Sequence, residues 1–182
     1  MFVALEGSDG TGKSTLLSIL ASRLGAISLQ TPPKEYSNER QRVDKDASLE
    51  DHYAFYRSIV YDTAEEIDAI LQSGGRVVID RYFLSTKTYH EVMGMEVPEN
   101  DFQDVVQPTL TVILSLNHGV QLQRMTGRGL TVGDKRTLKI QRQVAAAYYK
   151  NALEMNIPFV ILDTQRFTPP ECADIIMSAL GI

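Results

Sequence analysis

Short apolar runs recur along the chain and are separated by longer segments with a helical pattern. The five runs are Phe2 to Leu5, Ala26 to Leu29, Arg76 to Ile79, Leu110 to Leu116 and Phe159 to Leu162. Nearly continuous apolar runs of this length are typical of strands that are buried on both faces of a parallel sheet. The pattern therefore predicts an α/β three-layer sandwich, in which helices flank a five-stranded parallel sheet.

The intervening segments carry apolar residues at helical spacing and have recognisable ends. Ser14 to Leu24 places its leucines on one face, and Gly25 follows as a C-terminal cap. A longer apolar stripe extends from about Ser48 to Ser73, where two glycines end it. The last helix is expected to begin after Thr168, because two prolines and then Glu171 follow it in a capping-box arrangement.

Composition narrows the range of partners. With 182 residues, of which 43% are hydrophobic, the chain is expected to form a single domain over residues 1–182. Its formal net charge of -5 disfavours a nucleic-acid partner, and no apolar run approaches the roughly eighteen residues of a membrane-spanning helix. Cys172 is the single cysteine and no charged leader precedes the first strand, so we expect a cytoplasmic location.

The strongest chemical signal lies between the first predicted strand and the first predicted helix. Gly7-Ser8-Asp9-Gly10-Thr11-Gly12-Lys13-Ser14 matches the eight-residue phosphate-binding loop, or P-loop. Its glycines let backbone amides point inward at phosphate oxygens, and the following helix adds its positive dipole end. A chance glycine-rich turn is the alternative, and the strand-to-helix context counts against it. The expected ATP-phosphate contacts are Gly7, Asp9, Gly10, Thr11, Gly12, Lys13, Ser14 and Thr15.

Within this loop two side chains have distinct expected tasks. Lys13 should reach the β- and γ-phosphates, and Ser14 should bind Mg²⁺. A second candidate for Mg²⁺ is Asp80, at the carboxyl end of the third predicted strand, where open α/β sheets bind their ligands. Arg81 follows it and suits an acceptor that carries a phosphate, because an ionised phosphate oxygen needs holding but no base.

A third element follows the fourth predicted strand. Two arginines, Arg124 and Arg128, and two glycines lie in a polar segment there, and we interpret residues of about 124–135 as a mobile lid. Phosphoryl transfer to anything but water requires that water be excluded, and closing arginines can also stabilise charge on the transferring group. A solvated turn with scattered arginines is the alternative.

With these three elements in place, the sequence resembles the thymidylate kinase family of nucleoside monophosphate kinases along nearly its whole length. The stretch from Phe2 to Thr15 is similar to that family's opening. Asp80-Arg81-Tyr82, followed by Ser85, Thr86 and Tyr89, matches the family's DR(Y/H)xxSTxxY pattern. The resemblance implies a P-loop NTPase kinase fold with strand order 2-3-1-4-5, MgATP as phosphoryl donor and often a homodimer.

The resemblance also implies roles for single residues. Asp9 would lie near the acceptor's 3′-hydroxyl, Arg81 would grip the acceptor phosphate and Tyr89 would pack against the deoxyribose. Because no basic residue precedes the P-loop lysine, the arginine that stabilises the transition state would come from the lid. Arg128 is the candidate, with Arg124 against the adenine or the phosphates. Candidate catalytic residues are thus Lys13, Arg128, Arg81 and Asp9, and candidate acceptor contacts are Asp9, Phe55, Tyr56, Arg81, Ser85 and Tyr89.

The long helix departs from the family pattern at the base. Members commonly stack an aromatic residue on thymine and place an arginine four residues later, whereas Phe55 is followed by Ile59 and Tyr56 by Val60. Arg57 lies about 200° around the helix from Phe55 and is poorly placed to share the base.

The loop after the second strand departs as well. It reads Gln30-Thr31-Pro32-Pro33, where typical members carry Thr-Arg-Glu-Pro and use its arginine on the acceptor. Together with Ala54-Phe55-Tyr56 in the long helix, this loop looks similar to the UMP-CMP kinase type 2 branch.

These observations favour transfer from MgATP to a pyrimidine deoxynucleoside monophosphate, with dTMP first and dUMP, dCMP, UMP or CMP as alternatives. A deoxynucleoside kinase acting on a 5′-hydroxyl is a rival, but it needs a carboxylate beside that hydroxyl. An ATP-binding regulator without transferase activity is less favoured. Such a protein should have lost essential residues, yet the chain retains Lys13, Ser14, Asp80 and Arg81.

Overall fold

The computed structural model describes all 182 residues and contains one parallel sheet of five strands. The strands are β1 (Phe2–Glu6), β2 (Ile27–Gln30), β3 (Val77–Asp80), β4 (Leu110–Ser115) and β5 (Phe159–Asp163). They lie in the order β2-β3-β1-β4-β5, and all four pairings are parallel. The five predicted strands and their order are confirmed.

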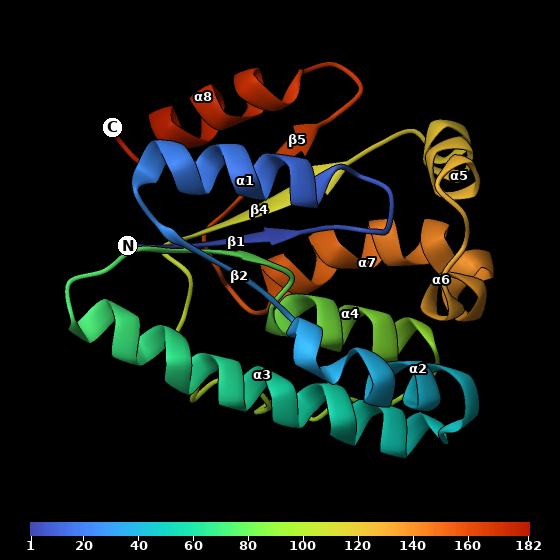
Figure 1. Ribbon diagram of the computed structural model, residues 1–182. Coiled ribbons are helices and arrows are strands. Elements are labelled where there is room, and N and C mark those ends of the chain that lie inside the picture. The colour runs from blue at the N-terminus through green and yellow to red at the C-terminus, as the bar shows by residue number, and fades with distance from the viewer.

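Helices cover both faces of the sheet. They are α1 (Lys13–Leu24), α2 (Ser37–Asp46), α3 (Leu49–Gln72), α4 (Phe83–Val92), α5 (His118–Gly127), α6 (Val132–Thr137), α7 (Gln141–Glu154) and α8 (Pro169–Ala179), with short 3-10 turns η1 (Lys34–Tyr36) and η2 (Leu138–Ile140). In Figure 1, α1 and α8 lie on one side of the sheet and α3, α4 and α7 on the other. The predicted three-layer sandwich is confirmed, and no helix is long and apolar enough to cross a membrane.

Strand β1 shows why two separate cores form. Successive side chains of a strand point to opposite faces, so Phe2 and Ala4 join the core under α3, α4 and α7. Val3 and Leu5 join the core under α1 and α8. Both faces of the strand are therefore apolar, as a central parallel strand requires.

Parallel register brings the ends of distant segments together. Leu5 lies opposite Asp80, so the end of β3 lies beside the loop that leaves β1. The predicted helix ends are also found: Ser48 caps α3, Gly25 ends α1 in a left-handed conformation, and a capping box opens α8. Phosphate-binding groups thus gather at one edge of the sheet.

The predicted lid is more ordered than its polar sequence suggested. Helix α5 continues to Gly127, since Met125 on its inner face is fully buried, and α6 begins at Val132 inside the predicted segment. Thr131 and Asp134 form a capping box that starts α6. The segment therefore consists of two helix ends joined by a short loop.

Candidate active site

The P-loop connects β1 to α1 by a turn that depends on glycine. Gly7 has a φ of 132°, and a Cβ there would lie 2.5 Å from the carbonyl oxygen of Leu114. Lys13 reaches back across the loop, and its Nζ donates to the carbonyl oxygens of Gly7 and Ser8, both at 2.9 Å. The loop therefore encloses the ammonium group that was predicted to meet the phosphates.

The electrostatics of this loop favour an anion. Lys13 is only 6% exposed, and burial lowers its pKa to about 8, with the Arg81 guanidinium acting in the same direction. Helix α1 begins at this residue, and no side chain caps its first turn. Bound phosphate would therefore meet free backbone N–H groups and two cations.

The two candidate metal ligands are neighbours. The hydroxyl of Ser14 donates to Oδ2 of Asp80 at 2.8 Å. Mg²⁺ is commonly held by one or two protein oxygens, with phosphates and water completing its octahedron. The pair fits that ligand set, whereas no cluster of three or more His, Cys, Asp or Glu side chains forms a cage elsewhere.

Asp9 and Arg81 form an ion pair beside the P-loop. Nη2 of Arg81 lies 2.6 Å from Oδ1 of Asp9, and the Tyr89 hydroxyl donates to the other carboxylate oxygen at 2.9 Å. Burial alone would raise the pKa of Asp9, but the charges of Arg81 and Lys13 hold it well below its ordinary value. Asp9 is therefore a persistent anion that orients two predicted acceptor contacts.

The Arg81 side chain is fixed along one edge and open along another. Nη1 donates to the Gly7 carbonyl and lies within 3.2 Å of the hydroxyls of Ser85 and Tyr148. Nη2 uses one hydrogen on Asp9, while Nε has no protein acceptor. The edge formed by Nε and the second Nη2 hydrogen can therefore bind a phosphate in bidentate fashion.

Glu6 and Tyr148 support Arg81 but are not among the site residues predicted from the sequence. Glu6 ends β1 fully buried, and its carboxylate accepts from the backbone N–H groups of Tyr82 and Ser85. Burial raises the pKa of Glu6 to about 7, although Ser85 and Arg81 oppose the shift. An acid at the end of an apolar strand could have indicated Glu6. Tyr148 lies in α7 and had no such indication.

A cavity of about 880 Å³ joins these groups to α2, α3, α4 and the lid. Predicted site residues that line it are Asp9, Gly10, Gly12, Lys13, Ser14, Thr15, Tyr56, Asp80, Arg81, Ser85, Tyr89, Arg124 and Arg128. Gly7 and Thr11 belong to the P-loop but do not line the cavity. Thr11 is buried, and its hydroxyl donates to the carbonyl oxygen of Ser8. Most of the predicted site thus faces one space.

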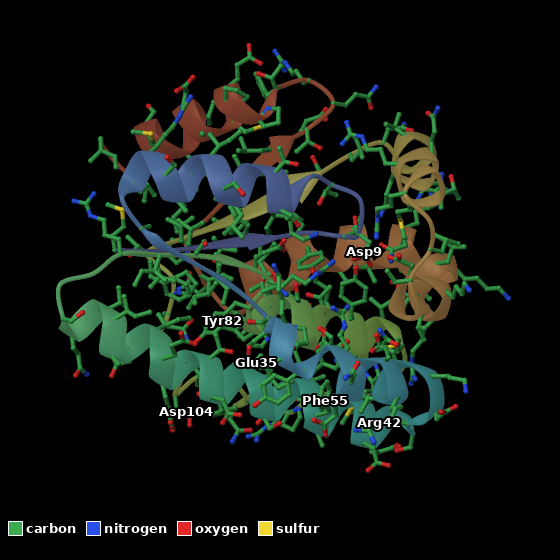
Figure 2. The ribbon with its side chains drawn as sticks, viewed as in Figure 1. Asp9, Glu35, Arg42, Phe55, Tyr82 and Asp104 are labelled. Carbon is green, nitrogen blue, oxygen red and sulfur yellow. The ribbon has the colours of Figure 1, made fainter.

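Phe55 is not brought into this space. Its ring packs edge-on against Tyr36 and Tyr56, and it does not line the cavity. Figure 2 shows Phe55 on α3, on the side of the molecule away from Asp9. Of the two adjacent aromatic candidates, only Tyr56 is rotated into the cavity wall. Arg57 is engaged elsewhere, with Asp101.

A polar cluster beside Tyr56 joins three helices. The Tyr56 hydroxyl donates to Asp44 of α2 at 2.8 Å, and Nε2 of His52 lies 3.3 Å from the same carboxylate oxygen. Nδ1 of His52 lies 2.7 Å from Nε2 of His90 in α4. The spacing of the histidines along the chain indicates no chemistry, and only the packing of α3 against α4 brings these two rings together.

The lid arginines face the cavity from the other side. Arg128 contacts Asp134 at 3.0 Å, and Arg124 lines the cavity as well. Arg136 of α6 donates to the carbonyl oxygens of Val43 and Asp44 at the end of α2. The lid is thereby attached to the helix that forms the far wall.

Comparisons with known proteins identify the family of this chain. A family model described as thymidylate kinase matches residues 5–170. A probable thymidylate kinase of Archaeoglobus fulgidus is 29% identical over 171 residues, covering 86% of this chain and 85% of the relative. A thymidylate kinase of Solidesulfovibrio magneticus is 27% identical, and the match covers 100% of this chain and 99% of the relative.

Solved structures show the same fold at lower identity. Thymidylate kinase from Candida albicans superimposes with a TM-score of 0.81 at 17% identity, covering 99% of this chain and 90% of that one. Deoxyadenosine kinase from M. mycoides with bound dATP gives a TM-score of 0.75 at 16% identity, with both chains fully covered. The chain therefore shares the fold of both proteins over nearly its whole length.

Proposed function

The chain belongs to the thymidylate kinase family, and we propose that its cavity binds ATP at the P-loop and dTMP beside Arg81. It is an ATP-dependent nucleoside monophosphate kinase, and dTMP is its acceptor. The observation that carries the site assignment is the shared cavity. Lys13 and the open edge of Arg81 face one space, and Asp9 lies between them.

In the proposed reaction an ionised oxygen of the dTMP phosphate attacks the γ-phosphorus of ATP. A new P–O bond forms, the bond from the γ-phosphorus to the β,γ-bridging oxygen breaks, and ADP leaves with that electron pair. No proton has to be removed from the acceptor. Lys13 neutralises the β- and γ-phosphates, Arg81 holds the acceptor phosphate, and Arg128 faces the transferring group from the lid.

Ser14 and Asp80 would hold Mg²⁺, which neutralises charge on the donor phosphates when it is bound. The remaining P-loop residues and Arg124 would contact the ATP. Tyr56 would pack against the acceptor base, and Tyr89 against the sugar. Ser85 would keep Arg81 in position through its hydroxyl.

The state of Asp9 disfavours a kinase that acts on a 5′-hydroxyl. Such a kinase needs a carboxylate that can accept a proton. Asp9 is bound by Arg81, Tyr89 and Gln141, and its lowered pKa makes it a weak base. Glu6 has the higher pKa, but it is fully buried and does not line the cavity.

An assay that couples ADP release to NADH oxidation tests the proposal. With MgATP, dTMP should accelerate ADP release more than dUMP, dCMP, UMP or CMP, and thymidine should not accelerate it. Arg81→Ala should lower kcat/KM for dTMP by about 10²- to 10³-fold, mainly through KM, because a bidentate phosphate contact is lost. An unchanged KM for dTMP in this variant would remove Arg81 from the acceptor site.

Three further features are proposals that rest on the sequence. We propose that residues 1–182 act as one domain, that the enzyme works in the cytoplasm and that it forms a homodimer. A cytoplasmic location agrees with Cys172, which is buried and unpaired.

A further inference from the structure

Arg40 of α2 is a cation of the cavity wall whose donors are largely unused. Its Nε donates to the Tyr56 hydroxyl at 3.0 Å and lies 3.4 Å from Asp44. Neither Nη atom has a protein hydrogen-bond acceptor, although the side chain is only 43% exposed. Four N–H groups of a guanidinium that is held by its Nε are therefore available to a molecule in the cavity.

The neighbouring ring identifies which part of that molecule Arg40 meets. Tyr89 is tied to Asp9 of the P-loop, so the sugar and phosphates belong beside it. Tyr56 is tied instead to α2 and lines the part of the cavity where the acceptor base is proposed to lie. Because Arg40 binds the hydroxyl at the tip of this ring, its free N–H groups are placed to meet the polar edge of a base that lies against Tyr56.

The nearest carboxylate is not available to the base. One oxygen of Asp44 accepts from Tyr56 and faces His52, and the other lies against Gly133 of the lid. A Cβ at Gly133 would lie 2.8 Å from that oxygen, so the lid covers it closely. The wall therefore offers the base donors rather than acceptors.

Hydrogen-bond directions in the histidine pair show how this wall is held together. A carbonyl oxygen can only accept, so Nδ1 of His90 donates to Thr86 at 2.6 Å. Nε2 of His90 must then accept from His52, whose other nitrogen faces Asp44. Asp44 is thus engaged by Tyr56, His52 and the Nε of Arg40, while the two Nη groups of Arg40 stay free.

We propose that Arg40 donates hydrogen bonds to a carbonyl oxygen on the edge of the acceptor base. Arg40 thereby makes the enzyme select 4-oxo pyrimidines, thymine and uracil, over the 4-amino pyrimidine cytosine. This inference rests on the proposed function as a monophosphate kinase. At the C4 position a cytosine amino group would place donor against donor, which disfavours binding.

The test compares Arg40→Met with Arg42→Met. Arg42 lies two residues along the same helix, is exposed and does not line the cavity, and Figure 2 shows it on α2 at the periphery. Methionine keeps an extended stem but removes the donors. For each variant, kcat/KM is measured with dTMP, dUMP and dCMP at saturating MgATP.

For Arg40→Met we expect the preference for dTMP over dCMP to fall by about 10- to 100-fold. The dTMP to dUMP ratio should stay within about twofold, because both bases present the same oxygen. Arg42→Met should match the parent enzyme. Equal losses with all three acceptors would overturn the proposal and assign Arg40 to the phosphate or to stability.

Two further measurements keep these outcomes separate. If the parent enzyme phosphorylates no monophosphate, the proposed function fails before the variants are compared. If Arg40→Met does not fold by circular dichroism, Arg40→Leu replaces it, because leucine also removes every donor. A dTMP to dCMP preference in Arg40→Leu that equals the parent value would also overturn the proposal.

Discussion

The two ends of the cavity are built in different ways. At the P-loop end, Lys13 is held by carbonyl groups of Gly7 and Ser8, six and five residues away in the chain. At the far end, the contacts among Tyr56, Asp44 and the histidines join side chains of three helices. The first end is specified by one continuous segment, whereas the second exists only after the helices have packed.

This difference separates catalysis from selection. A loop made from its own backbone presents the same donors whatever acceptor is bound, so changes there should affect every acceptor alike. In the proposed site, side chains from α2 and α3 meet the acceptor base, so changes there should alter the ranking of acceptors. Four predictions test this division, from the largest expected effect to the smallest.

Lys13→Met should have the largest effect. Removing a buried cation aimed at the donor phosphates should lower kcat by about 10³-fold with dTMP and dUMP alike. Steady-state kinetics with both acceptors measure this, with exposed Lys45→Met as the control. A loss that depended on the acceptor would break the division between the two ends.

Glu6→Gln should change how stability depends on pH. The folded pKa of Glu6, about 7, exceeds its ordinary value of 4.5, so the folded state binds the extra proton between these values. The free energy of unfolding should therefore fall as pH rises from about 4.5 to above 7, by up to roughly 3 kcal/mol for this group. Glutamine mimics the protonated acid, so the variant should not show this fall.

Urea unfolding at pH 5 and pH 8 measures the difference between the two proteins. The comparison is necessary because His90 acts in the opposite direction. Burial lowers the pKa of His90 to about 4, so its contribution to stability grows as pH rises from about 4 to 6.5. Parallel pH profiles for the parent and Glu6→Gln would show that Glu6 stays ionised when folded.

Arg128→Ala should lower kcat by about 30- to 100-fold and leave the KM of dTMP nearly unchanged. Arg128 faces the cavity from the lid and is oriented by buried Asp134. Exposed Arg142 is the control. A large rise in the KM of ATP with an unchanged kcat would instead make Arg128 a binding residue.

Arg136→Gln tests whether the two ends of the cavity act together, because Arg136 of α6 links the lid to α2. It donates to the carbonyls that end α2, next to Asp44. Loss of these contacts should raise the KM of both ATP and dTMP by about three- to tenfold, with little change in kcat. A change confined to ATP would show that the lid and α2 do not move together.

Much of the fold followed from local patterns. The apolar runs predicted all five strands: the inner strands β1, β3 and β4 are buried on both faces and tolerate few polar residues, and the more exposed edge strands β2 and β5 still kept a readable apolar run. The caps at Gly25 and Thr168 were readable because each satisfies the backbone of its own helix end. The lid was less readable. Its polar residues hide Met125, whose burial extends α5 through the predicted flexible segment.

At the end of the cavity formed by α2 and α3, the sequence did not determine which of two aromatic residues lines the cavity, and the packing of α3 did. Phe55 and Tyr56 are adjacent, so they face about 100° apart on a helix, and only the orientation of α3 decides which one enters the cavity. Likewise His52 and His90 are 38 residues apart, and their contact depends on how α3 and α4 pack.

The sequence by itself determined the P-loop, the Asp80-Arg81 pair and the strand framework that brings them to one edge. Each is encoded within a few consecutive residues, where backbone geometry dictates the result. Only the tertiary structure decided that Arg40, Asp44 and the two histidines share a wall. Contacts between side chains of separate helices depend on the rotation and docking of whole helices, and no local spacing records these.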